Sequence, residues 1–308
     1  MTMQGRSATG TIILDESKAG RVAPHRSATR RFLRGFWRTR MALPALVVIG
    51  LLVFCAISAN VIAPYDPVTD QTYAVANTGP STAHFLGADY LGRDILSRVI
   101  FGARVSLLVG FVAVGIGIFA GVSIGLVAGF LGGSTESVLM RFTDAIWAFP
   151  ALILALAITS ALGSGIVNAM IAIGVVNIPA FARLARASTL SVREQDFVTA
   201  GRALGASNAR IIARYVLPNI AAPIIIQASL LFGAAITTEA GLSFLGVGVQ
   251  PPTPSWGGDL RTGYQYMAIN PALAFAPGIA IFITVLACNF LGDALRAALD
   301  PRLSREGT

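Results

Sequence analysis

Long apolar segments constrain this chain more than any other feature of its sequence. A helix needs about 20 apolar residues to cross a bilayer, because lipid offers no partner for backbone N–H and C=O groups. Of the 308 residues, 55% are hydrophobic and only 12% are charged, a balance unlike that of soluble domains. The sequence therefore predicts an all-α integral membrane protein. Six segments are expected to be transmembrane helices: 43–63, 104–130, 143–162, 164–183, 220–247 and 273–294.

Basic residues are distributed unequally between the two sides that these spans define. Six spans place both termini on one side, and 19 of the 23 Lys and Arg residues fall on that side. Because loops rich in Lys and Arg stay in the cytoplasm, we expect both termini to be cytoplasmic. The net charge of +8 follows from this asymmetry and from attraction to anionic membrane lipid. It requires no nucleic acid partner.

The spans and the composition between them divide the chain into five regions. The N-terminal region is polar, partly disordered and ends in an interfacial anchor of Arg and aromatic residues. The expected regions are a cytoplasmic tail at 1–42, the first transmembrane helix at 43–63, an extracytoplasmic loop with an amphipathic helix at 64–103, a core transmembrane domain at 104–296 that includes a cytoplasmic loop at 184–219, and a cytoplasmic tail at 297–308.

Two segments on the outer side have distinctive patterns. Leu91, Ile95 and Val99 recur at helical spacing beside Arg93 and Arg98, which is typical of an amphipathic helix lying on the membrane surface. The segment "PPTPSWG" (251–257) cannot continue a helix because of its prolines. We expect a rigid outer loop there, with Trp256 at the membrane interface. Its position makes the loop a candidate contact for an extracytoplasmic protein.

Four glycines in the second span, Gly117, Gly121, Gly125 and Gly129, are spaced four residues apart. Small residues on one helix face allow another helix to approach closely, so this strip is predicted to be a packing face. The same stretch contains "GVSIG" (121–125), which matches the nucleophile motif of serine hydrolases. Packing is the favoured interpretation, because both histidines of the chain lie outside the spans.

Between the fourth and fifth spans lies "VREQDFVTAGRALGASNARIIARYVLPN" (192–219), which carries charges of both signs. Helix-favouring residues extend from Glu194 to Leu204, Gly205 can end that helix in a left-handed conformation, and Ser207 can cap a second helix. Pro218 suits the first turn of the fifth span. The pattern predicts two short helices at an angle, joined rigidly to that span, which could transmit a push from a soluble partner.

Polar residues within the spans are few. Glu239 lies beside Thr237 and Thr238 in an apolar run, where an ionisable group either lines a pathway or is buried and hydrogen-bonded to a neighbouring helix. Two pairs have the i, i+3 spacing of local ion pairs on one helix face. These are Arg141 with Asp144 at the end of the third span, and Asp293 with Arg296 at the end of the sixth.

Groups that could perform chemistry are scarce. Cys55 and Cys288 both fall inside spans, where a thiol packs as a small apolar group, so no disulfide is expected. The phosphate-binding fingerprint G-x-x-x-x-G-K-[ST] does not occur in the sequence, so any ATP must be hydrolysed on another chain. We expect no catalytic residue, no metal site and no cofactor bound by this chain.

The loop motif "TAGRALG…YVLP" resembles the cytoplasmic loop of ATP-binding-cassette (ABC) importer permeases. Ala200, Gly205, Leu217 and Pro218 match the family pattern, whereas Thr199, Gly201 and Tyr215 depart from it. Four further segments resemble the C-type permease of dipeptide, oligopeptide and nickel importers, and the resemblance covers about 270 residues. The segments are "HFLGADYLGRDILSRVIFGARVSL" (84–107), "LMRFTDAIWAFPALILAL" (139–156), "EAGLSFLGVGVQPPTPSWG" (239–257) and "PGIAIFITVLACNFLGDALRAALDPRL" (277–303), in which only Ala297 departs noticeably.

This resemblance implies a type I ABC importer permease fold in the bacterial cytoplasmic (inner) membrane. It implies a homologous B-type permease, two cytoplasmic ABC ATPase subunits that hold ATP and Mg, and an extracytoplasmic substrate-binding protein as partners. Di- or oligopeptides are the favoured cargo, with nickel left open. The segment 197–208 would be the helix that couples to the ATPase, with these residues: Phe197, Thr199, Ala200, Gly201, Leu204, Gly205, Ala206, Ser207 and Pro218.

Two other functions are weighed against this one. A secondary transporter driven by an ion gradient would show internal repeats and broken helices that converge on an ion site, but the sequence offers one buried carboxylate, Glu239, and no visible repeat. An intramembrane enzyme would need paired catalytic groups at membrane depth, and the sequence contains none. The importer permease is therefore the favoured function, and the chain is not itself expected to be an enzyme.

Overall fold

Five helices in the computed structural model are long and apolar enough to cross a bilayer. The structure describes residues 35–37 and 39–299. The predicted disorder of the N-terminal tail therefore concerns residues outside the described ranges, and so does the end of the C-terminal tail. Apart from an isolated bridge between Ala88 and Asp94, the regular structure of the described residues is helical, which confirms the all-α class. The five helices are Ala42–Ile62, Ile95–Leu131, Ile166–Arg193, Asn208–Phe244 and Ala272–Leu299.

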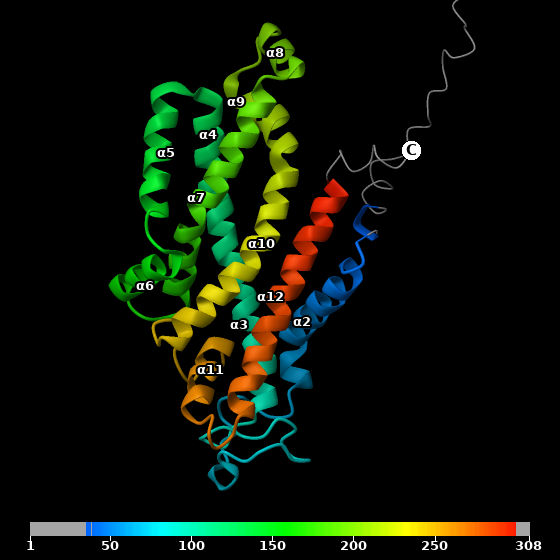
Figure 1. Ribbon diagram of the computed structural model, residues 1–308, viewed down its shortest axis with the longest axis vertical. Helices are drawn as coiled ribbons and strands as arrows, with labels where there is room; N and C mark the ends of the chain where they lie inside the picture. Colours follow the sequence, from blue (N-terminus) through cyan, green and yellow to red (C-terminus); the bar gives the residue numbers. More distant parts are fainter. Residues whose placement is uncertain (1–34, 38, 300–308) are drawn as a thin grey trace, which may run out of the picture.

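The helices run up and down along one long axis (Figure 1). One end of the molecule carries α8 and the turn between α4 and α5, and the other carries α11 and the loop that follows α2; we name these the α8 end and the α11 end. The elements are α2 (Ala42–Ile62), η2 (Tyr73–Val75), α3 (Ile95–Gly117), η3 (Ile118–Val122), α4 (Ser123–Leu131), α5 (Gly133–Trp147), α6 (Ala151–Leu162), α7 (Ile166–Arg193), α8 (Asp196–Ala203), α9 (Asn208–Ile211), η4 (Ile212–Val216), α10 (Leu217–Phe244), α11 (Trp256–Gln265) and α12 (Ala272–Leu299).

The predicted amphipathic helix on the membrane surface is not present. Residues 84–94 form a turn-rich loop, and α3 starts at Ile95 and runs without interruption into the second span. Asp94 caps this helix by accepting a hydrogen bond from the backbone N–H of Ser97 at 2.8 Å. The prediction was wrong because Arg93 and Arg98, which were assigned to water or lipid headgroups, are buried against carboxylates.

The third span, predicted as one helix over 143–162, is two helices. α5 and α6 meet at an angle of 89° across a short break, and in Figure 1 α6 lies at the side of the bundle, crosswise to the long axis. Pro150 precedes α6 and has an extended ψ of 130°. A proline lacks the N–H needed to continue α5 and disfavours helical conformation in the residue before it. The described residues therefore contain five continuous candidate spans and one bent pair.

The glycine strip of the second span faces α7. A Cβ atom at Gly121 would meet Phe181 and Ala182, one at Gly125 would meet Ala185, and one at Gly129 would meet Thr189. Glycines four residues apart would drift around an ideal helix by ~40° per step. The π-helical segment η3 (Ile118–Val122) winds more widely, which offsets the drift and keeps the strip on one face.

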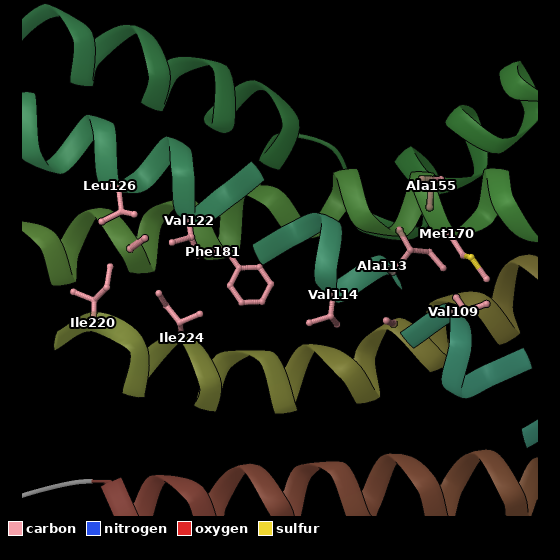
Figure 2. Packing of buried hydrophobic residues seen from close by; sticks show 14 of the residues in the cluster. Val109, Ala113, Val114, Val122, Leu126, Ala155, Met170, Phe181, Ile220 and Ile224 are labelled. Atoms are coloured by element: carbon pink, nitrogen blue, oxygen red, sulfur yellow. The ribbon is translucent and has the colours of Figure 1, made fainter. Parts of the chain in front are cut away.

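The apolar core fills the space between α3, α7 and α10. Phe181 is fully buried and lies among Val114, Val122 and Ile224 (Figure 2). Because lipid is as apolar as these side chains, helix association in a membrane depends on close van der Waals packing. The contact of small residues on α7 with the glycines of α3 and α4 permits that packing and fixes the position of α7, which leads directly to α8.

Candidate functional site

The loop at the α8 end contains one short helix with a fixed end. α8 closes with two hydrogen bonds, from the N–H of Gly205 to the carbonyl of Arg202 at 2.9 Å and from the N–H of Ala206 to the carbonyl of Gly201 at 3.0 Å. This pair of bonds is the Schellman arrangement. It requires a left-handed residue, and Gly205 has a φ of +77°. The chain thus leaves α8 in one defined direction.

The second short helix of the prediction is not a separate element. Ser207 does cap α9, by accepting the N–H of Arg210 at 3.4 Å, but α9 continues through η4 into α10 as one helix from Asn208 to Phe244. Pro218 lies at the start of α10, but within the continuous helix and not in its first turn, where the sequence predicts it. Its missing N–H leaves a carbonyl one turn earlier without an intrahelical partner, and the helix is π-helical at that point. α8 is therefore attached directly to the end of the fifth span.

α8 has a buried face and an exposed face. Val198 is fully buried and Gly201 is buried, whereas Phe197 is 41% and Leu204 88% exposed. The Phe197 ring lies 6.3 Å from the Tyr215 ring, and the Arg202 guanidinium lies 5.3 Å from the Phe130 ring centroid of α4. The helix is thereby held against both η4 and α4 and presents apolar side chains outward, together with Thr199 and Ala200.

The polar residues of α10 separate into two environments. Glu239 is fully buried. Its Oε1 accepts a hydrogen bond from the Ser243 hydroxyl at 2.7 Å, on the same helix rather than on a neighbouring one, and its Oε2 has no partner. Thr237 lines a groove of about 380 Å³ with Phe282 and Asn289 of α12. Its hydroxyl donates to the carbonyl of Gly233, and that of Thr238 donates to the carbonyl of Ala234.

Both predicted local ion pairs are absent from the described residues. Asp144 pairs with Arg183 of α7 at 2.8 Å instead of with Arg141. A second pair joins the same two helices closer to the α8 end, where Nε of Arg186 donates to Glu136 at 2.6 Å. On α12, no ion pair joins Asp293 to Arg296. Spacing within one helix could not identify these partners, because they come from a second helix that crosses the first.

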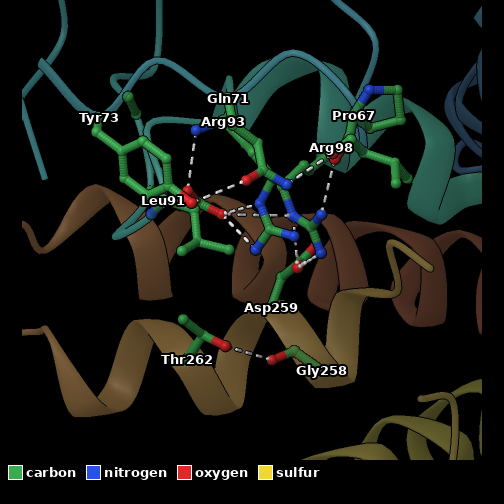
Figure 3. Close-up of polar contacts among 12 residues, drawn as sticks. Pro67, Gln71, Tyr73, Leu91, Arg93, Arg98, Gly258, Asp259 and Thr262 are labelled. Atoms are coloured by element: carbon green, nitrogen blue, oxygen red, sulfur yellow. Dashed lines mark hydrogen bonds and ion pairs between the residues drawn. The ribbon is translucent and has the colours of Figure 1, made fainter. Parts of the chain in front are cut away.

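A buried charge network at the α11 end escaped the sequence analysis. Arg98 donates to Asp259 of α11 through Nε at 2.9 Å and to the carbonyl of Pro67 at 3.0 Å, while Nε of Arg93 donates to Asp89 at 2.7 Å (Figure 3). Burial raises the pKa of the Asp259 carboxyl, against the opposing charge of Arg98. The network joins the loop after α2, the start of α3 and α11.

Trp256 is another correction. It was expected at the membrane interface, but it is fully buried at the start of α11. Its indole N–H donates to the carbonyl of Val99 at 2.9 Å. The exposed part of the outer loop is Gln250–Thr253, while Pro254 and Ser255 are buried.

The remaining reactive groups of the described residues are the two cysteines and the side chains that commonly bind metal ions. Cys55 and Cys288 are both free. No group of three or more His, Cys, Asp and Glu side chains in the described ranges is placed to hold a metal ion. The broken third span is a feature that a secondary transporter would also show.

Comparison with known proteins identifies the family. The family model described as "Binding-protein-dependent transport system inner membrane component" matches residues 121–305, and that of the "N-terminal TM domain of oligopeptide transport permease C" matches 27–80. The glutathione transport system permease protein GsiD of Pectobacterium atrosepticum is 42% identical over 296 residues, which is 96% of each chain. GsiD of Escherichia coli O6:K15:H31 is 45% identical over 278 residues, covering 90% of this chain and 92% of its own.

A solved structure has the same fold. An inward-facing structure of the MetNI methionine ABC transporter contains a chain that is 19% identical and has a TM-score of 0.56, with coverage of 67% of this chain and 98% of that one. This likeness confirms the type I fold. The family models and the relatives show that the chain is a multi-pass ABC importer permease, a member of the family of binding-protein-dependent transport system inner membrane components.

Proposed function

We propose that this chain is one of two permease subunits in an ATP-driven importer that receives small peptides of the glutathione class from a binding protein. The observation that carries the proposal is the geometry of α8, whose exposed Phe197 and Leu204 project from the end of the molecule on a turn fixed by Gly205. Exposed apolar side chains on a helix that lies beyond the membrane spans favour a contact with another protein. The expected contact is a groove of a cytoplasmic ABC ATPase.

The coupling follows from how α8 is attached. ATP-driven closure of two ATPase subunits would move α8 as a rigid body, because its end is set by a Schellman turn. That movement would reach α10 directly through the continuous helix from Asn208 and reach α4 through the contact of Arg202 with Phe130. Rocking of these spans against a homologous B-type permease would open the pathway to each side in turn. ATP and Mg would remain on the ATPase subunits.

Orientation is part of the proposal. The α8 end is assigned to the cytoplasm because it carries a run of described arginines, at positions 186, 193, 202, 210 and 214, and loops rich in Arg stay in the cytoplasm. The exposed segment Gln250–Thr253 at the α11 end would then face the binding protein. Single-cysteine variants test this assignment: an impermeant thiol reagent outside the cell should label positions 77 and 253 and miss position 188. The opposite pattern would overturn the orientation and the coupling mechanism.

The relatives refine the cargo. Their names specify glutathione transport, and glutathione is itself a small peptide with an ammonium group and two carboxylates. Peptide cargo is therefore retained from the sequence-based expectation, with glutathione ahead of longer peptides and nickel.

Reconstitution tests the whole assignment. The chain would be incorporated into proteoliposomes with its permease partner and ATPase subunits, and uptake of labelled glutathione and of a dipeptide would be measured. Uptake should require both ATP and the binding protein. Uptake by the permease chains alone, driven by a proton or sodium gradient, would establish the secondary transporter in its place.

A further inference from the structure

The break in the third span exposes non-helical backbone, which lipid does not accommodate. α5 ends at Trp147 and α6 begins at Ala151, at an angle of 89°, and residues 147–150 are all exposed. The carbonyls of Asp144 and Ile146 still accept the N–H groups of Ala148 and Phe149, but the carbonyls after Ile146 lie at the helix end, where a continuous span would supply partners. Non-helical backbone within a membrane protein is tolerated where it is buried in protein or lines a water-filled cavity.

A charged cluster lies next to this break. The Asp144 and Arg183 side chains form an ion pair of 2.8 Å while remaining 57% and 42% exposed. The Arg183 guanidinium lies 4.5 Å from the ring centroid of Trp147, which is itself 51% exposed. Arg141, one helical turn from Asp144, is exposed, and within the described residues it forms no hydrogen bond or ion pair.

The exposed ion pair on α5 and α7 indicates what surrounds this part of the two helices. Ionisable side chains in membrane spans almost always face a bundle interior or a water-filled cavity, because hydrocarbon does not solvate them. The exposed Asp–Arg pair and the exposed non-helical backbone beside it both indicate a water-filled cavity. We take this face of α5 and α7 to be open to water.

We propose that Asp144, Arg183 and Trp147 form a contact site for zwitterionic peptide cargo on the pathway, an inference that rests on the proposed function. A guanidinium binds a carboxylate through two parallel hydrogen bonds, and the Asp144 carboxylate can accept hydrogen bonds from an ammonium group. A peptide supplies both groups. A bound peptide can therefore replace the Asp144–Arg183 ion pair with two new ones, its carboxylate to Arg183 and its ammonium group to Asp144, so that neither charge is left unpaired. Trp147 offers an apolar surface to the cargo.

Arg141 extends the same site. Its free guanidinium lies on the helix that carries Asp144 and Trp147, one turn earlier. Glutathione has two carboxylates, so a second cation would complement the additional charge. A cargo with one carboxylate would need Arg183 alone.

The chain contains a matched control for this site. Glu136 and Arg186 join the same two helices through the same kind of ion pair, but they lie closer to the α8 end and away from the break. If both pairs only tie α5 to α7, removing either one should have the same effect. If Asp144 and Arg183 contact cargo, only their removal should alter its movement.

The test compares Asp144→Asn and Arg183→Gln with Glu136→Gln and Arg186→Gln in the complete complex in proteoliposomes. We measure imported glutathione per ATP hydrolysed. In the first two variants this ratio should fall about tenfold, as expected for loss of a charged hydrogen bond, while ATP hydrolysis stimulated by the binding protein is kept. The control pair should keep the wild-type ratio, and Arg183→Lys should recover part of the loss.

A second measurement tests whether the face is open to water. In a background with Cys55→Ala and Cys288→Ala, Asp144→Cys should react with a charged thiol reagent in inside-out vesicles. No reaction would place the face against lipid or a partner subunit and would overturn the inference, as would equal transport ratios for the two pairs. A wild-type complex that imports neither glutathione nor a dipeptide would overturn the proposed function as well, so the two failures can be distinguished.

Discussion

Gly102 of α3 lies directly against the indole ring of Trp256 at the start of α11. A Cβ atom at position 102 would be 2.6 Å from Cδ1 and 2.8 Å from Nε1 of Trp256. The same indole donates its N–H to Val99, one turn earlier on α3. One buried aromatic side chain thus holds α11 against the second span, and the absence of a side chain at 102 makes that contact possible.

Gly102→Ala should therefore destabilise the protein. A single methyl group would force the indole away from α3, and overpacking of this kind costs about 1–3 kcal/mol. Gly115→Ala on the same helix is the matched control, because no atom lies within 4 Å of a Cβ built there and alanine favours helix. Thermal unfolding of the purified complex should show a lower midpoint for the first variant alone. Equal midpoints would mean that the Trp256 contact is dispensable.

Gly125→Leu should separate α4 from α7. A Cβ atom at this position would lie 2.7 Å from the Cβ of Ala185 and would also clash with the backbone of Ala182. Neither atom belongs to a flexible side chain that could rotate away. We expect less assembled complex after detergent extraction, measured by size-exclusion chromatography. Val127→Leu, at an exposed position of the same helix, should assemble normally. Normal assembly of Gly125→Leu would contradict the packing role of the strip.

Local rules explain what could be predicted from the sequence. The six apolar segments, the glycine spacing and the end of α8 at Gly205 all depend on residues within a few positions of each other. These features need no knowledge of what packs against them. The glycine strip was visible in the sequence for this reason, but its partner α7 was not.

The features that could not be predicted from the sequence depend on contacts between segments that are distant along the chain. Asp144 had a local candidate in Arg141 and selects Arg183 instead, because α7 crosses α5 at that level. Arg93 and Arg98 were assigned to the membrane surface, yet Asp89 and Asp259 neutralise them in the interior. The bend before Pro150 was missed because hydropathy continues across it, although the proline itself was a signal that could have located it.

The pair of Arg98 and Asp259 should respond unequally to single and double replacement. Asp259→Leu would leave Arg98 buried without its main partner, which costs about 3–5 kcal/mol. Asp259→Leu combined with Arg98→Met removes both charges and should restore most of the lost stability. The unfolding midpoints of the two variants would be compared with wild type. A double variant no more stable than the single one would show that the charges themselves are required at this position.

Gly205→Val should uncouple the importer while leaving its membrane part intact. Gly205 has a φ of +77°, and a Cβ built there meets no atom within 4 Å. Any effect of a larger residue must therefore come from backbone strain and not from a clash. A β-branched residue in this conformation costs on the order of 1–2 kcal/mol, and the strain is relieved by turning α8 away from its position over η4 and α4.

Gly205→Asn separates strain from the mere loss of glycine, because asparagine adopts the left-handed conformation more readily than other residues. With the valine, transport and ATP hydrolysis stimulated by the binding protein should fall together, whereas membrane level and pairing with the second permease remain. With the asparagine, both activities should stay close to wild type. A valine variant that transports at the normal rate would show that the loop is a passive connector, since a tilted α8 could not deliver the ATPase movement to α10.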